Sequence, residues 1–361
     1  MLTMEKRVVY YDMLRGLAII GVVGIHAFWS YQDYLITNPM SKVDFNIFIR
    51  QLIGCCVPMF LALSGFFLAN KDLSTFSLYT KFLKKQVLRV YIPCLIFSIP
   101  FLIWGLQHYF GDSNYFTKVC YNRTLMCKDG NLIENVLYYL VCAESVFYFV
   151  AVIIQFYVLL PLMQKLAELK IKGLLIGALI SLLTTIILYY IAYIQNINLI
   201  LIIYGGLFPF WVLYYLIGVY YGRGYRLNMS WKTALILAII FIPIMYAETY
   251  YMVIDKGYNL PAAMGNRKFS WIVYCTFVLI AMFEYAKDFK ANKVTTFLSV
   301  AGEYSYGIYL IHLFFLLFVV KTIFPDLSWL IETPVTILLS MAVIAIVRKI
   351  NQPMAKKYFG F

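Results

Sequence analysis

The sequence predicts an all-α fold that crosses a membrane about ten times. Of the 361 residues, 63% are hydrophobic and 13% are charged, and the mean hydropathy of +0.80 is far too high for a soluble domain. The apolar residues form continuous runs of about 20 residues, which is the length that a helix needs to cross the hydrocarbon core. Continuous runs favour helices over a β-barrel because a barrel strand alternates between apolar and polar residues.

The predicted spans are separated by polar connections, and the last of them is the shortest. They cover residues 10–30, 46–69, 89–107, 136–160, 173–192, 199–222, 233–252, 269–286, 297–320 and 333–347. The first is expected to be retained, since Arg15 interrupts it and Ala27-Phe-Trp-Ser lacks a signal-peptidase pattern. We expect one membrane-embedded domain over residues 1–361, with no appended soluble domain.

The distribution of basic residues predicts that both termini are cytoplasmic. The N-terminal side, alternate connections and the C-terminal segment carry twenty of the 30 Lys and Arg residues. The other connections hold eight, and Arg15 and Arg50 lie within spans. These eight are Lys42, Lys118, Arg123, Lys128, Lys256, Arg267, Lys268 and Lys321. The net charge of +13 therefore indicates contact with anionic membrane lipids, and no nucleic-acid partner is expected.

Two ionisable residues in the first span are the strongest functional signal. Arg15 and His26 are eleven residues apart, which in a helix is a turn of about 1100° and a rise of about 16 Å. Both side chains therefore lie on one face at different depths. An ionisable residue inside a membrane helix is costly and marks a functional site by default.

The cysteines and histidines carry less information. Cys120 and Cys127 share the longest external connection, where a disulfide and two free thiols are equally expected. The other five cysteines lie in apolar spans and are interpreted as buried hydrophobes. With three histidines and no CxxC motif, no metal and no bound cofactor are expected.

Four ordered motifs resemble the acyltransferase-3 family of integral membrane O-acyltransferases. The first joins Tyr11-Asp-Met-Leu-Arg-Gly to the Arg15 and His26 spacing. It is followed by Pro58-Met-Phe-Leu-Ala-Leu-Ser-Gly-Phe-Phe, Gln155-Phe-Tyr-Val-Leu-Leu-Pro and Gly302-Glu-Tyr-Ser-Tyr-Gly-Ile-Tyr-Leu-Ile-His. The resemblance covers essentially the whole chain.

The resemblance implies transfer of an acyl group, usually acetyl from acetyl-CoA, to a hydroxyl of a cell-surface glycan or a lipid-linked saccharide. It also implies a location in a bacterial inner or plasma membrane. The family arginine and histidine correspond to Arg15 and His26. Members often carry a second basic pair, Arg-x-x-Arg, at the third span, whereas this chain reads Gln86-Val-Leu-Arg89. Arg89 is expected to bind the donor, and Lys84 and Lys85 are candidates to supply the missing charge.

The chemistry of an acyl-CoA fits this arrangement. Its phosphates lie at one end and its thioester at the end of a long arm, so a cation near the cytoplasmic face and a reacting group deeper in the membrane are both needed. Arg15 is predicted to meet the phosphates or the arm. His26 is predicted to act as a general base, or as a nucleophile through an acyl-histidine intermediate. The non-catalytic alternatives are an ion pair between Arg15 and Asp12 and a helix-to-helix hydrogen bond from His26.

Several further polar residues are candidates for the lining of the site. Ser64 could line the donor tunnel, although close helix packing is the favoured interpretation. Glu144 and Gln155 repeat the eleven-residue spacing, and Glu144 could orient His26. In the ninth span, Tyr306 could line the site, and His312 is interpreted first as a structural hydrogen-bond donor.

A transporter or polysaccharide exporter without acyl transfer is the alternative function, because ten helices with charges at mid-depth also suit alternating access. The two halves of the chain show no convincing repeat, and the polar residues cluster in the first four spans and the ninth. These observations favour the enzyme. Transfer of succinyl or another acyl group is a variant of the same interpretation.

Overall fold

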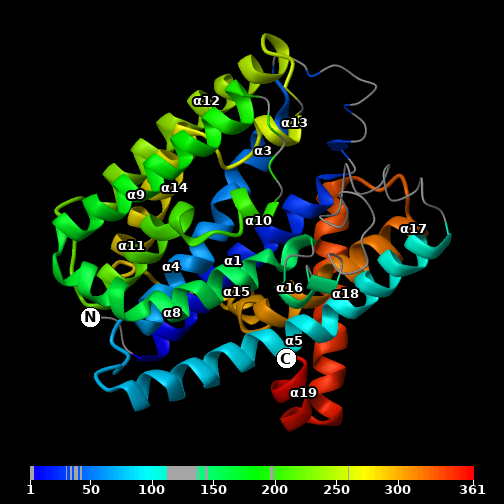
Figure 1. The fold of residues 1–361 in the computed structure, drawn as a ribbon, viewed down its shortest axis with the longest axis horizontal. Coiled ribbons are helices and arrows are strands. Elements are labelled where there is room, and N and C mark those ends of the chain that lie inside the picture. The colour runs from blue at the N-terminus through cyan, green and yellow to red at the C-terminus, as the bar shows by residue number, and fades with distance from the viewer. Residues whose placement is uncertain are drawn as a thin grey trace.

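The computed structural model describes residues 4–29, 31–32, 35, 40, 43–111, 136–137, 139–142, 145–195, 197, 199, 201–258 and 260–361. Over these residues the regular structure is helical and contains no strand, which confirms the predicted all-α class (Figure 1).

Eight segments of the described chain are long and apolar enough to cross a membrane. They are α1 (Met4–Ala27); α3, η1 and α4 (Phe45–Leu52, Ile53–Cys55 and Cys56–Leu68); α5 (Phe76–Gly111); α8 (Tyr148–Glu168); α9 and η3 (Ile171–Tyr189 and Tyr190–Ile194); α12 (Trp231–Ile254); α16, η5 and α17 (Ser305–Phe314, Phe315–Val320 and Lys321–Ile323); and α18 (Trp329–Ile350). The protein is therefore a multi-pass membrane protein.

Two of the ten predicted spans are not found in that form. The helix in 269–286 is α14 (Phe269–Tyr285), which has 17 residues. The segment 199–222 is broken into α10 (Leu201–Tyr204), η4 (Phe208–Trp211) and the buried helix α11 (Val212–Gly222). The break begins at Gly205 and Gly206, and Pro209 follows in η4; these residues disfavour a continuous helix.

The break leaves a backbone carbonyl and a backbone N–H without helical partners, and a side chain of α8 supplies their hydrogen bonds. The side-chain amide of Gln155 donates to the carbonyl oxygen of Gly206 at 2.7 Å, and its oxygen accepts from the Phe208 N–H at 3.0 Å. Because an unpaired backbone group in lipid is costly, these bonds make the interruption tolerable. The side chain of Gln155 thus has a structural role.

The predicted span 297–320 is also divided. It consists of α15 (Lys293–Glu303) and α16, which meet at Tyr304, so the membrane-crossing part begins at Ser305. A side chain at Gly302 of α15 would overlap the carbonyl oxygen of Asp12, and one at Gly16 of α1 would overlap that of Leu298. Glycine at both positions lets the two backbones touch. Helix α1 packs against α4, α15, α16 and α18, which makes it central to the site described below.

Gly302→Val is expected to separate α1 from α15 and lower the thermal stability of the protein. Overpacking of a close contact costs about 1–3 kcal/mol, and the measurement is the thermal unfolding midpoint in detergent. Ala345→Val, at an exposed position of α18, is the matched control and should leave the midpoint nearly unchanged. Equal midpoints for the two variants would contradict the tight contact.

Candidate active site

A cavity of about 660 Å³ lies beside α1 and reaches from Arg15 to His26. Its walls come from α1, α4, α5, α8, α15 and α16, together with the end of α18 and the C-terminal helix α19 (Gln352–Tyr358). Among its lining residues, the polar side chains are Asp12, Arg15, His26, Ser64, Gln86, Arg89, Tyr148, Tyr157, Glu303, Ser305, Tyr306, Tyr309, Arg348, Gln352 and Lys356.

Arg15 lies at one end of the cavity and is held there from two sides. Its Nη1 is 2.6 Å from Oδ1 of Asp12, and its Cζ lies 4.5 Å from the centre of the Phe67 ring. The ion pair predicted as the alternative role of Arg15 is therefore present. The side chain still has 34% of its surface exposed, so the pair leaves donors free for a ligand.

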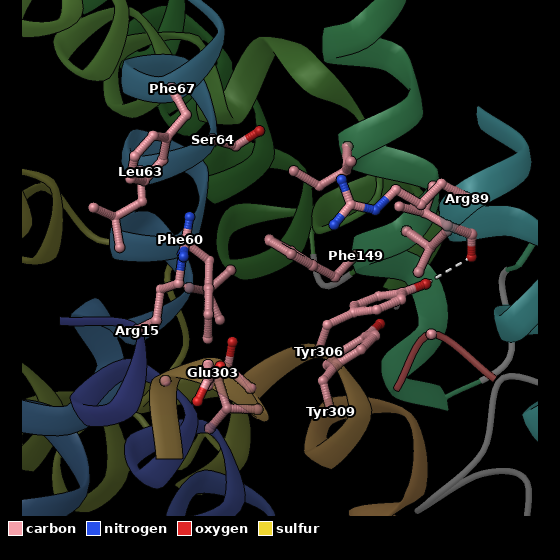
Figure 2. A pocket seen from close by; sticks show the side chains of 18 of the residues that line it. Arg15, Phe60, Leu63, Ser64, Phe67, Arg89, Phe149, Glu303, Tyr306 and Tyr309 are labelled. Atoms are coloured by element: carbon pink, nitrogen blue, oxygen red, sulfur yellow. Dashed lines mark hydrogen bonds between the residues drawn. The ribbon is translucent and has the colours of Figure 1, made fainter. Parts of the chain in front are cut away.

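Arg89 of α5 extends into the same space from the opposite wall (Figure 2). Gln86, one turn earlier on α5, also lines the cavity, so the residue that departs from the family pattern occupies the expected place. Lys85 is exposed and is not among the lining residues, and the same holds for Lys84. The additional charge at this end comes from elsewhere.

Two cations near the C-terminus supply that charge. Arg348 at the end of α18 and Lys356 of α19 both line the cavity. The Cζ of Arg348 lies 4.3 Å from the centre of the Tyr304 ring, which positions the guanidinium beside the junction of α15 and α16. In the sequence both residues belong to the basic C-terminal segment, which indicates only membrane topology. Their distance along the chain from Arg15 conceals that they line the same cavity.

Tyrosines of α16 form the wall between the two ends. Tyr306 donates to the carbonyl oxygen of Val90 at 2.7 Å, and Tyr309 donates to that of Val146 at 2.8 Å (Figure 2). The two rings are stacked, with centres 6.2 Å apart. These bonds attach α16 to α5 and to the segment before α8, so the wall is fixed by backbone contacts.

His26 lies at the far end of the cavity and contacts a second histidine. Its Nδ1 is 3.0 Å from Nε2 of His312, which is fully buried on α16. The ring of Trp29 lies on another side, with its centre 5.3 Å from that of His26. His26 itself keeps part of its surface exposed and lines the cavity, whereas His312 lies behind it.

The hydrogen bonds of His312 determine which nitrogen of His26 is free. The Nδ1 of His312 lies 2.7 Å from the carbonyl oxygen of Tyr309 and 3.1 Å from that of Ile308. Carbonyl oxygens only accept, so this Nδ1 carries the proton of the neutral ring and Nε2 accepts from His26. His26 therefore donates through its Nδ1, and its Nε2 keeps a lone pair that is available for chemistry.

Comparison with known proteins assigns the chain to a family. The family model of the acyltransferase-3 group, described as an acyltransferase domain, matches residues 8–349. The chain belongs to this family. No curated protein and no solved structure matches it significantly. The chain is thus a membrane acyltransferase, and the resemblance over nearly its whole length is confirmed.

The structure of this acyltransferase brings together most of the residues predicted for its site. Arg15, His26, Arg89, Asp12 and Ser64 line the cavity, as does Tyr306, and His312 contacts His26. Gln155 is absent from the lining because it serves the break before α11. Glu144, Cys120 and Cys127 lie outside the described residues.

Proposed function

We propose that this acyltransferase moves an acyl group, acetyl from acetyl-CoA in the first instance, to a hydroxyl of a cell-surface glycan or a lipid-linked saccharide. One observation carries the proposal: a single cavity joins a cationic end at Arg15 and Arg89 to the free Nε2 of His26. An acyl-CoA has the matching distribution of groups, with phosphates at one end of an arm and the thioester at the other.

The charges at the Arg15 end favour a polyanionic donor. Arg15, Arg89, Arg348 and Lys356 line the cavity, and the carboxylates of Asp12 and Glu303 do not balance them. Guanidinium groups bind phosphate oxygens through paired, charge-assisted hydrogen bonds. With the positive-inside distribution of basic residues, the Arg15 end faces the cytoplasm, where acyl-CoA is made.

At the other end, His26 provides the reacting group. In the direct route its Nε2 takes the proton of the acceptor hydroxyl while the hydroxyl oxygen attacks the thioester carbonyl carbon. The carbon–sulfur bond then breaks, and the CoA thiolate receives the proton. In the alternative route Nε2 attacks the thioester carbonyl carbon, the carbon–sulfur bond breaks and the CoA thiolate leaves with the acyl group on His26. The acceptor hydroxyl oxygen then attacks that acyl group, the bond to Nε2 breaks, and the hydroxyl proton goes to the thiolate. Both routes use the same lone pair.

A transfer assay with purified protein distinguishes this function from transport. The protein in detergent is incubated with acetyl-CoA labelled in the acetyl group and with glycans from the native cell surface. Covalent label on the glycan is expected without a sealed membrane. Export of unmodified glycan from proteoliposomes, with no labelled product in either system, would instead support a transporter. Succinyl-CoA in a parallel reaction tests the identity of the acyl group.

Loss of the Arg15 guanidinium is expected to weaken donor binding. Asp12→Asn combined with Arg15→Met removes the charge without leaving Asp12 unpaired, and the KM for acyl-CoA should rise about tenfold or more, the equivalent of one charge-assisted hydrogen bond. The KM for the acceptor should stay the same. Lys232→Met, at an exposed position of α12, is the control. An unchanged donor KM in the double variant would show that Arg15 is structural.

A further inference from the structure

A second group of charged residues lies near His26 but outside the lining of the cavity. It is formed where α3, α10 and α13 (Leu260–Ala263) approach the end of α12 and the start of α14 (Figure 1). We call it the second polar cluster, and it comprises Arg50, Gln51, Glu248, Thr249, Arg267 and Lys268.

Lys268 is fully buried in this cluster, its hydrogen-bond partners are neutral, and it interacts electrostatically with the carboxylate of Glu248. Its Nζ donates to the carbonyl oxygen of Met245 at 3.2 Å and to the hydroxyl of Thr249 at 2.5 Å. The side-chain amide of Gln51 donates to the same hydroxyl. Burial lowers the pKa of Lys268 to about 8, so the ammonium form still predominates at neutral pH. A buried cation needs an anion nearby, and Glu248 is the one carboxylate of the cluster that can serve its three cations.

Arg50 interacts electrostatically with both Lys268 and His26, so it is near both groups. Its Nε has no hydrogen-bond partner. Part of its surface nevertheless stays accessible. Arg50 also interacts with Tyr148, which lines the cavity. An anion bound by Arg50 would therefore lie close to the reacting centre.

Arg267 adds a third positive charge. Its Cζ lies 4.5 Å from the ring centre of Tyr204 and 5.1 Å from that of Tyr193, so aromatic faces hold it in place of carboxylates. It is 8% exposed, and its Nε also lacks a hydrogen-bond partner. The guanidinium is thus fixed within the cluster by aromatic contacts.

The carboxylates of this region leave the charge unbalanced. Glu248 accepts a hydrogen bond from Ser270. Asp44 is used at the start of α3, where it accepts from the Asn46 and Ile47 N–H groups and from the hydroxyl of Tyr31. Within the described residues of the second polar cluster, three cations therefore face one carboxylate.

We propose that the second polar cluster binds an oxyanion, a phosphate or a carboxylate, carried by the acceptor. Arg50 makes the contact, and Lys268 and Arg267 raise the positive potential behind it. The acceptor is then an anionic saccharide whose charged group is held at Arg50 while its hydroxyl reaches His26. This inference rests on the proposed acyl transfer for the identity of the ligand, but the oxyanion site itself can be tested without it.

The binding test measures thermal unfolding of the purified protein in phospholipid-free detergent with inorganic phosphate or pyrophosphate, against chloride at equal ionic strength. Because the donor end also binds phosphate, Arg89→Gln and Arg50→Gln are compared. Phosphate is expected to raise the unfolding midpoint of Arg89→Gln. The phosphate concentration that gives the same rise should be about tenfold higher for Arg50→Gln. A higher concentration for Arg89→Gln than for Arg50→Gln would overturn the site. Stabilisation by phosphatidylglycerol, with none by phosphate or pyrophosphate, would assign Arg50 to a lipid headgroup and also overturn the proposal.

Arg50→Gln on its own should not unfold the protein. It removes a buried and unpaired charge, so the midpoint without phosphate is expected to stay or rise. A fall would indicate a structural cation, and Arg50→Lys then provides the second test. It keeps the charge but loses the paired donors, so phosphate should bind with intermediate strength. Binding equal to that of the unmodified protein would contradict direct contact.

The transfer test uses two oligosaccharides that differ only in one phosphate group. The KM for the phosphorylated acceptor should rise about tenfold in Arg50→Gln, with the KM for the neutral acceptor and for acyl-CoA unchanged. Equal KM values for both acceptors in the unmodified protein would overturn the inference and leave the acyltransferase function intact. Phosphate binding that depends on Arg50, with no transfer to any acceptor, would preserve the site and refute the function.

Discussion

His26→Ala is expected to abolish acyl transfer. The variant removes the Nε2 lone pair that both chemical routes require, and the loss of a general base alone costs about 10²–10⁴-fold in rate. The measurement is the rate of label transfer from acetyl-CoA to the acceptor with purified protein. The KM for donor, where residual activity allows it, should not change because Arg15 and Arg89 stay in place.

Expression, membrane insertion and the unfolding midpoint separate this chemical role from a structural one. His26 contributes one hydrogen bond to His312, so the midpoint should fall only slightly. Normal product from a folded His26→Ala protein would remove the mechanism. A large fall in the midpoint together with lost activity would indicate that the histidine pair mainly joins α1 to α16.

His312→Leu is expected to lower kcat on the order of 10²-fold with little change in either KM. Without an acceptor opposite Nδ1, the His26 ring is free to place its proton on Nε2, the atom that must take the acceptor proton. His312 does not line the cavity, so we treat it as a positioning residue.

Rescue by glutamine tests that role. In His312→Gln the side-chain oxygen can accept from the His26 Nδ1–H, so kcat should recover in part, whereas leucine offers no acceptor. Because both variants remove the bonds of His312 to Tyr309 and Ile308, a purely structural role would reduce activity equally in both. Equal kcat values would therefore contradict the assignment.

The part of the site that lies on α1 was predictable from the sequence. Arg15 and His26 share one uninterrupted helix, so their relation follows from helical geometry alone. The eleven-residue spacing between Glu144 and Gln155 was less informative. A polar side chain inside a span can face either a cavity or a break in a neighbouring helix. The need for an amide at that place arises only when Gly206 and Phe208 leave the helical path.

The remaining cations required tertiary structure. Arg348 and Lys356 are more than 300 residues from Arg15 in sequence, and nothing in their local pattern distinguishes them from topology-determining charges. Arg50 was visible as a charge within a span, but its relation to Lys268 depends on the packing of α3 against α12. The described chain supports eight of the ten predicted spans, because hydropathy counts the apolar residues of α11 regardless of the break that precedes them.

The continuity of α1 sets a requirement on the length of any donor. No proline or irregular turn interrupts the helix between Arg15 and His26, so it cannot fold to bring them together, and their separation along its axis stays near 16 Å. The helix therefore fixes the distance between the cation that binds the donor and the histidine that reacts with it. A thioester carried on a shorter arm than this distance would leave its carbonyl out of reach of His26 even when its anionic end is fully bound.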